Sequence, residues 1–130
     1  MIVIINPINK IYSEVKKSVS SLCTNTSRTY KSTPQKMPFL YFKVIGSPTT
    51  CRDLDNNENA INLSIEIKVY TSGTNALAEA EKIFALANDR LFEMGFDRYY
   101  GIEPLENISD TTITQLIARY RRTVCAGEFQ

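Results

Sequence analysis

The sequence of 130 residues contains no histidine and only three cysteines. Cys23, Cys51 and Cys125 are an odd number of thiols without the paired spacing of a metal site. These absences argue against a structural zinc site and against a catalytic triad that uses histidine. We expect the cysteines to be reduced and to pack as small apolar side chains.

Long apolar runs and glycine-rich loops are also missing. No apolar run reaches the roughly 18 residues needed to span a bilayer. The start of the chain has four consecutive aliphatic residues with no basic residue before them, which is too short for a secretory signal and predicts a protein that stays in a cytoplasm. The five glycines stand singly, so no phosphate-binding loop is present.

Acidic residues give no better sign of chemistry. Asp53 and Asp55 form one close pair, and Glu103 and Glu106 form another, but both pairs lie in segments that read as loops, where carboxylates are usually solvated. Residues 53–58 resemble a calcium loop in composition but lack its central glycine and its spaced glutamate. The sequence therefore predicts no catalytic residue, no cofactor and no metal ion.

The clearest structural signal lies in the middle of the chain. Residues 60–70 alternate between apolar and mostly polar side chains, which predicts a strand with one buried face. After a turn at 71–74, apolar residues recur at helical spacing as far as Met94. Asn75 or Thr74 can cap this helix, and Gly95 is placed to end it.

The other segments complete an α+β fold in one domain, with a mostly antiparallel sheet, a long hairpin and two helices packed on one face of the sheet. A first helix is predicted over 7–22, and strands over 38–46, 96–101 and 111–125, the strand at 38–46 being covered on both faces. Residues 24–37, 47–59 and 102–110 are predicted to be connections, the first with a short edge strand near 28–31. Residues 126–130 are predicted to be a flexible end.

Charge is unevenly distributed along the chain. Residues 1–36 hold six basic residues and one acidic residue, whereas residues 51–110 hold five basic and twelve acidic residues. This asymmetry suits head-to-side self-association or complementary partner surfaces, and it equally suits a mixed, solvated surface. A nucleic-acid-binding protein is expected to be more basic overall.

One basic and aromatic cluster stands out, at Arg119, Tyr120, Arg121 and Arg122. Such a cluster can contact phosphates, but on a strand it is more often part of a protein interface or a salt-bridged face. Five tyrosines can serve either as interface anchors or as ordinary sheet surface. They are Tyr41, Tyr70, Tyr99, Tyr100 and Tyr120.

In the order of its segments, the chain resembles the tail terminator (tail completion) proteins of long-tailed phages. NPINKIYSEVKKSV resembles the opening helix of that family, and MPFLYFKVIG resembles its proline-plus-aromatic strand. INLSIEIKVYTSGTNALAEAEKIFALANDRLFEMGF resembles its strand, turn and alanine-containing helix. RYYGIEPLENISDTTITQLIARYRRTV resembles its closing part, and the likeness covers roughly residues 5–125. The polar connection at 24–37 departs from the family pattern.

The resemblance implies a structural virion protein and not an enzyme. Members of the family form a hexameric ring that caps the tail tube, ends its growth and presents a surface to head-completion or stopper proteins. The expected partners are thus copies of the chain itself, the major tail tube protein and the head connector, with DNA passing through the lumen without specific binding and with no membrane. The expected location is the tail or neck of the virion, after assembly in the host cytoplasm.

The resemblance also suggests where the interfaces lie. In a ring, each subunit contacts its neighbours through two different patches. The polar side chains of 60–70 are candidates for a subunit boundary or for the wall of the lumen. The candidate interface residues are Arg52, Asp53, Asp55, Glu66, Lys68, Tyr70, Arg119, Tyr120, Arg121 and Arg122.

Three other interpretations stay open. The chain can be another component of the head–tail connector, such as a stopper or joining protein, or the cap of a phage-derived contractile device. It can be a small α+β domain unrelated to phages that binds a ligand or regulates another protein. A small enzyme is the remaining class.

Overall fold

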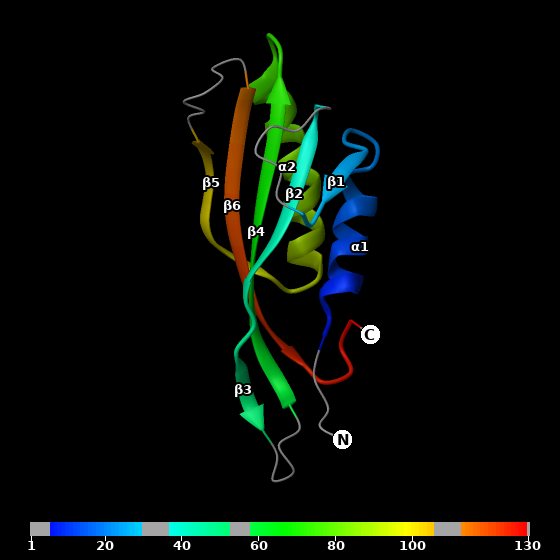
Figure 1. Ribbon diagram of the computed structural model, residues 1–130, viewed down its shortest axis with the longest axis vertical. Coiled ribbons are helices and arrows are strands. Elements are labelled where there is room, and N and C mark those ends of the chain that lie inside the picture. The colour runs from blue at the N-terminus through cyan, green and yellow to red at the C-terminus, as the bar shows by residue number, and fades with distance from the viewer. Residues whose placement is uncertain (1–5, 30–36, 53–57, 106–112, 130) are drawn as a thin grey trace.

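The computed structural model describes residues 6–29, 37–52, 58–105 and 113–129 (Figure 1). It has two helices and a six-stranded sheet, and it confirms the predicted α+β fold. The elements are α1 (Ile8–Val19), β1 (Asn25–Ser27), β2 (Phe39–Gly46), β3 (Thr49–Arg52), β4 (Glu58–Ser72), α2 (Ala76–Glu93), β5 (Asp97–Leu105) and β6 (Ile113–Cys125).

The sheet is built around β4. The strand order is β1-β2-β4-β6-β5, and β3 pairs with the start of β4. All pairs are antiparallel except β1 with β2, which is parallel. The predicted hairpin of β2 and β4 is confirmed, and β6 pairs along β4 from Ala60 to Ser72.

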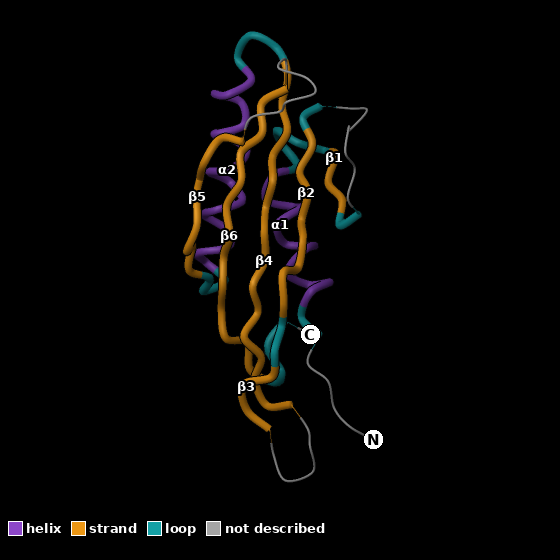
Figure 2. The backbone as a smooth tube through the Cα atoms, turned by 60° about the vertical axis from the view of Figure 1, so that its left-hand side comes forward, coloured by secondary structure: helices purple, strands orange, loops and turns teal. Residues whose placement is uncertain are grey.

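Both helices cover one face of the sheet (Figures 1 and 2). The alternating residues of β4 explain this arrangement, because one parity of the strand is aliphatic and points at the helices. Each of its five aliphatic side chains is at most 1% exposed. These are Ile61, Leu63, Ile65, Ile67 and Val69. Each contributes roughly 1.5–3 kcal/mol by burial, so this row anchors the core.

The boundaries of α2 agree with the sequence pattern, whereas α1 ends at Val19 and not at the predicted residue 22. Asn75 precedes α2 as predicted, although its side chain makes no capping hydrogen bond. Thr71 instead holds the turn, since its buried hydroxyl donates to the carbonyl oxygen of Ala76 at 2.6 Å. Gly95 follows the helix with a φ of +88°, the left-handed conformation expected there.

Four predictions about where strands begin and end are wrong. The segment at 47–59 contains β3, because Thr49 and Thr50 suit an extended backbone and the strand pairs with the start of β4 through Thr49, Cys51 and Arg52. The hairpin therefore projects beyond the helices (Figure 1). β5 continues to Leu105 instead of ending at 101, because an edge strand tolerates Pro104. The short edge strand is Asn25–Ser27, ahead of the predicted 28–31, and β4 extends on both sides of 60–70.

The C-terminal residues, expected to form a flexible end, fold back in a turn over 126–129. The carboxylate of Glu128 accepts a hydrogen bond from the backbone N–H of Cys125 at 2.8 Å and forms an ion pair with Arg122. The guanidinium of Arg122 also lies 4.8 Å from the ring centre of Phe129. These contacts tie the turn to the end of β6.

Two thiols can be placed. Cys23 is buried as predicted, whereas Cys125 is exposed, so the predicted packing is wrong for Cys125. Within the described part of the chain, neither helix is long and apolar enough to cross a membrane.

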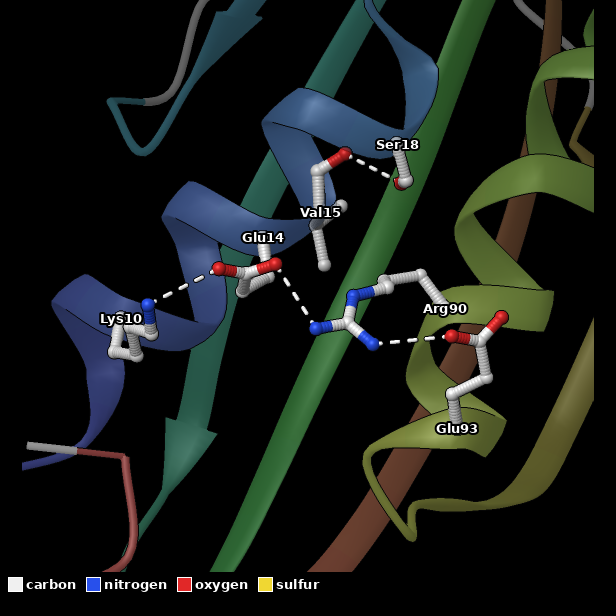
Figure 3. A network of polar contacts seen from close by, with 6 residues as sticks. All are labelled: Lys10, Glu14, Val15, Ser18, Arg90 and Glu93. Atoms are coloured by element: carbon white, nitrogen blue, oxygen red, sulfur yellow. Dashed lines mark hydrogen bonds and ion pairs between the residues drawn. The ribbon is translucent and has the colours of Figure 1, made fainter.

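A chain of ion pairs joins the two helices (Figure 3). Arg90 of α2 contacts Glu14 of α1 at 2.9 Å and Glu93 at 3.1 Å, and Lys10 contacts Glu14 at 3.1 Å. The hydrogen bond from Arg90 is the main cause that lowers the pKa of Glu14 below its ordinary value. The contact bridges 76 positions in sequence, so it fixes α1 against α2.

We expect Gly101→Ala to lower the free energy of unfolding by about 3 kcal/mol or more, because the new Cβ meets backbone. Gly101 has a φ of +78°, and a Cβ there would lie 2.2 Å from the carbonyl oxygen of Ile117. Gly73→Ala is the matched control, since its φ is +103° but nothing lies within 4 Å. It should lose only about 1–2 kcal/mol. Urea unfolding measures both, and equal losses would contradict the close approach of β5 to β6.

We expect Glu14→Gln to reduce the dependence of stability on acidic pH. The pKa of Glu14 is lowered in the folded state, so its contribution is present above its unfolded value of about 4.5 and is lost as pH falls through the folded value. The urea midpoint of the variant should fall less than that of the wild type as the pH is lowered from about 5 to about 3, because this range runs from above the unfolded pKa to well below it. Glu81→Gln, at an exposed position of α2, should follow the wild-type profile.

Candidate functional site

One face of the sheet carries no helix in the described part of the chain (Figure 2), and we call it the helix-free face. Register places four of its side chains in one row across four strands. Lys43 of β2 pairs with Glu66 of β4, Glu66 with Arg119 of β6, and Arg119 with Tyr100 of β5. Paired residues share a face of an antiparallel sheet, so these side chains are neighbours.

Glu66 is the centre of this row. Its side chain is only 5% exposed, although it carries a carboxylate on the helix-free face of the central strand. Nε of Arg119 lies 3.0 Å from Oε2 of Glu66, and Nζ of Lys68 lies 3.7 Å from Oε1. The two cations compensate the buried carboxylate, which would otherwise be costly to desolvate.

Aromatic rings cover both arginines. The guanidinium of Arg119 lies 5.0 Å from the ring centre of Tyr100, and that of Arg121 lies 5.2 Å from the ring centre of Tyr99. The hydroxyls of Tyr99 and Ser64 are hydrogen-bonded at 2.6 Å, which fixes the second ring. The two pairs form a rigid surface of planar cations on rings.

Arg121 differs from Arg119 because no ion pair within the described residues engages its guanidinium. Arg121 is exposed, and no carboxylate within the described ranges lies at ion-pair distance from it. The charge of Arg119 is instead engaged by Glu66. Arg121 is therefore a cation of this face that a partner can use.

A concavity of about 610 Å³ lies beside Arg121 on the same face, open to solvent. Irregular register at 44–46 in β2 and at 98–100 in β5 flanks it. Its lining includes Ile45 and Tyr99, which are 45% and 41% exposed, together with Asp97 and Arg121. Apolar and charged groups in one shallow hollow suit contact with a macromolecule more than enclosure of a small ligand.

Tyr70 lies on the predicted face but is nearly covered. It is 3% exposed and packs with Phe39 and Tyr41, with its ring centre 5.8 Å from that of Phe39. This second apolar cluster confirms that β2 is covered on both faces at its start. Tyr70 is therefore a packing residue of the helix-free face and is not available for contact with a partner.

Residues 119–122 do not share one surface, and the predicted interface position of Tyr120 is wrong. Tyr120 is 0% exposed in the core, where its hydroxyl donates to Oδ1 of Asn88 at 2.9 Å. Burial raises its pKa to about 12. Arg122 shares the parity of Tyr120 and is engaged by the C-terminal turn. Because side chains of a strand alternate, only Arg119 and Arg121 reach the helix-free face.

The structure brings Glu66, Lys68, Tyr70, Arg119 and Arg121 together on this face. Arg52 lies in β3 at the projecting end of the hairpin, away from that row. Asp53 and Asp55 lie outside the described residues. Within those residues, no group of three or more acidic or cysteine side chains could hold a metal ion.

The sequence names Tyr99 and Tyr100 among five tyrosines that can anchor an interface, but it does not predict that both stack on arginines of one face. Strict alternation places neighbouring residues on opposite faces, which would separate Tyr99 from Tyr100. The register of β5 shifts between Arg98 and Tyr100, and a bulge brings both rings to the same face. The only sequence feature that could have indicated this bulge is the pair of adjacent tyrosines directly before Gly101.

We expect Arg119→Met to destabilise the fold by about 1–3 kcal/mol, because it removes the closest cation from a buried carboxylate. Arg121→Met keeps the aliphatic stem at the neighbouring exposed position and should change stability by less than about 0.5 kcal/mol. Chemical denaturation compares them. Equal stability of the two variants would contradict a structural role for Arg119.

No protein-family model matches the chain, and no match to it is found among curated proteins. A function therefore has to be argued from the residues and geometry above, together with the resemblance in segment order.

Proposed function

We propose that this chain is the subunit of a phage tail terminator, a ring that caps the tail tube, ends its elongation and joins the tail to the head connector. The observation that carries the proposal is the helix-free face. It is a broad, rigid protein surface in a chain whose segments resemble that family in order. The ring would belong to the virion tail or neck and assemble in the host cytoplasm.

The chemistry of the helix-free face supports a role in protein contact. Arginine and tyrosine are enriched in protein interfaces because they combine large contact area with directed hydrogen bonds. Here both arginines are held over rings, and Glu66 fixes one of them. Little side-chain freedom remains to be lost on binding, which favours a preorganised contact.

The helices support a division of roles between the two faces. They pack on one face and are joined by the Glu14–Arg90 ion pair, so that layer stabilises the domain. The other face is left for the tail tube or the lumen wall. In this assignment the major tail tube protein contacts the Arg121 side of the sheet, and DNA passes through the ring without specific binding.

The first test is the oligomeric state of the purified chain, measured by light scattering alone and after addition of isolated tail tubes. The proposal expects a hexamer, or a monomer that becomes a ring on tubes. A stable dimer that binds a small ligand would reject it in favour of a small ligand-binding domain.

Arg121→Glu should reduce tail capping by about tenfold or more while the fold stays intact, because a rim charge of the wrong sign repels a complementary partner. Lys82→Glu is the matched control: it makes the same charge change at an exposed position of α2, on the helix side. Capping is measured by the length distribution of tubes in electron micrographs. Unchanged capping by Arg121→Glu would remove the helix-free face from the tube contact.

A further inference from the structure

We infer that copies of this chain bind each other through the two opposite edges of the sheet, the β5 edge of one copy against the α1 edge of the next. This inference rests on the proposed ring and names the surfaces that would close it. The partner at both edges is a second copy of the chain. The two edges differ in charge and in apolar character.

The strand order places these edges at opposite ends of the sheet. β1 ends one side, with α1 lying over it, and β5 ends the other (Figures 1 and 2). α2 lies between them and contacts β6 and β4, with Asn88 reaching Arg98 of β5 at 2.9 Å. The flank of α2 that carries Asn88 therefore belongs to the β5 edge.

The α1 edge is basic. Tyr12 faces β1, where its hydroxyl lies 3.2 Å from that of Thr26, and Lys16 follows it by one helical turn on that flank. Lys16, Lys17 and Arg28 are exposed. Arg28 donates to Asn9 at 2.7 Å, and none of the three cations has a carboxylate within ion-pair distance in the described part of the chain. Their charges are available to a partner.

The β5 edge is acidic. Glu81 and Asp89 are exposed on α2, and Asp97 and Glu103 are exposed on β5. No ion pair engages these four carboxylates among the residues that the structure describes. Two cations lie among them: Arg98 is bonded to Asn88, and Arg121 is the cross-strand partner of Asp97. Four carboxylates against two guanidiniums leave this edge negative and complementary to the α1 edge.

Exposed apolar side chains also gather at the β5 edge. Six large apolar residues of the described chain are markedly exposed, and four of them flank this edge. They are Leu77 (49%), Phe92 (49%), Tyr99 (41%) and Tyr100 (36%). Leu22, 46% exposed, follows α1 at the other edge. Apolar side chains surrounded by charges are typical of a contact surface.

Side chains, and not added strands, would carry this contact. β5 has register shifts at 98–100 and 101–103 and contains Pro104, which together interrupt the outer row of backbone groups. β1 is only three residues long. Because both edges are poor templates for strand addition, the exposed side chains decide the pairing.

Two different edges produce a heterologous contact, which repeats in one direction and closes into a ring. The two edges repeat in the same orientation in every copy, and the β5 edge adjoins the helix-free face at Tyr99 and Tyr100. The helix-free face therefore stays on the same side of every copy, where the tube or the lumen would meet it.

The experiment uses two full-length variants with reversed edges. Lys16→Glu with Lys17→Glu makes both edges acidic, and Glu81→Lys with Asp89→Lys makes both edges basic. Each variant alone should associate at least about tenfold more weakly than the wild type, because like charges meet. An equimolar mixture should recover assembly, since every contact then joins an acidic edge to a basic one. Analytical ultracentrifugation measures the oligomers.

Lys82→Glu is the control, because it reverses an exposed charge on α2 that belongs neither to the helix-free face nor to the charges changed at the two edges. Circular dichroism and thermal melts check folding, and Lys16→Gln with Lys17→Gln provides a milder change if the reversal unfolds α1. Rings that form equally well from either reversed variant would overturn this inference and leave the proposed function standing. A wild-type chain that stays monomeric with and without tail tubes would overturn both.

Discussion

The alternation of β4 is the constraint on which the structure depends. This strand pairs with β2 and β3 on one side and with β6 on the other, so its two faces set the two faces of the whole sheet. Its aliphatic parity recruits both helices. Its other parity supplies Ser64, Glu66 and Lys68 to the helix-free face. A slip of one residue would exchange these sets and bury a carboxylate among the helices, so burial and charge together specify the register.

Glu66 links this constraint to the surface. A buried carboxylate is tolerated only when cations lie close to it, and here they come from Arg119 of the neighbouring strand β6 and from Lys68 of β4 itself. The ion pair in turn positions Arg119 beneath Tyr100. The same residues thus favour the native register and shape the outer surface, while Arg121, one pair further along, stays free for a partner. Arg119, which stabilises the fold, and Arg121, which is proposed to contact a partner, are thus two positions apart in β6.

Local periodicity predicted α2, β4, β6 and the α+β class because these elements each carry a full apolar row. The same periodicity indicates that Tyr120 is a core residue, because Tyr120 shares the parity of Leu116 and Ala118. Other features depend on non-local pairing. β3 exists because it meets the start of β4, and β5 continues through Pro104 because it is an edge strand. The bulge that brings Tyr99 and Tyr100 together has no counterpart in a strict two-residue period.

In the proposed ring, the two surfaces of the chain would do different work. Contacts between opposite edges set the number of subunits, because the rotation from one copy to the next follows from the angle at which the edges meet. The helix-free face sets what the ring binds. Since Lys16 and Asp89 lie on the helices and not on the helix-free face, changes there should alter assembly, whereas a change at Arg121 should mainly alter what an assembled ring recognises. A single surface that served both purposes could not give such separable effects, and this distinction would set a terminator subunit apart from a simple self-associating domain.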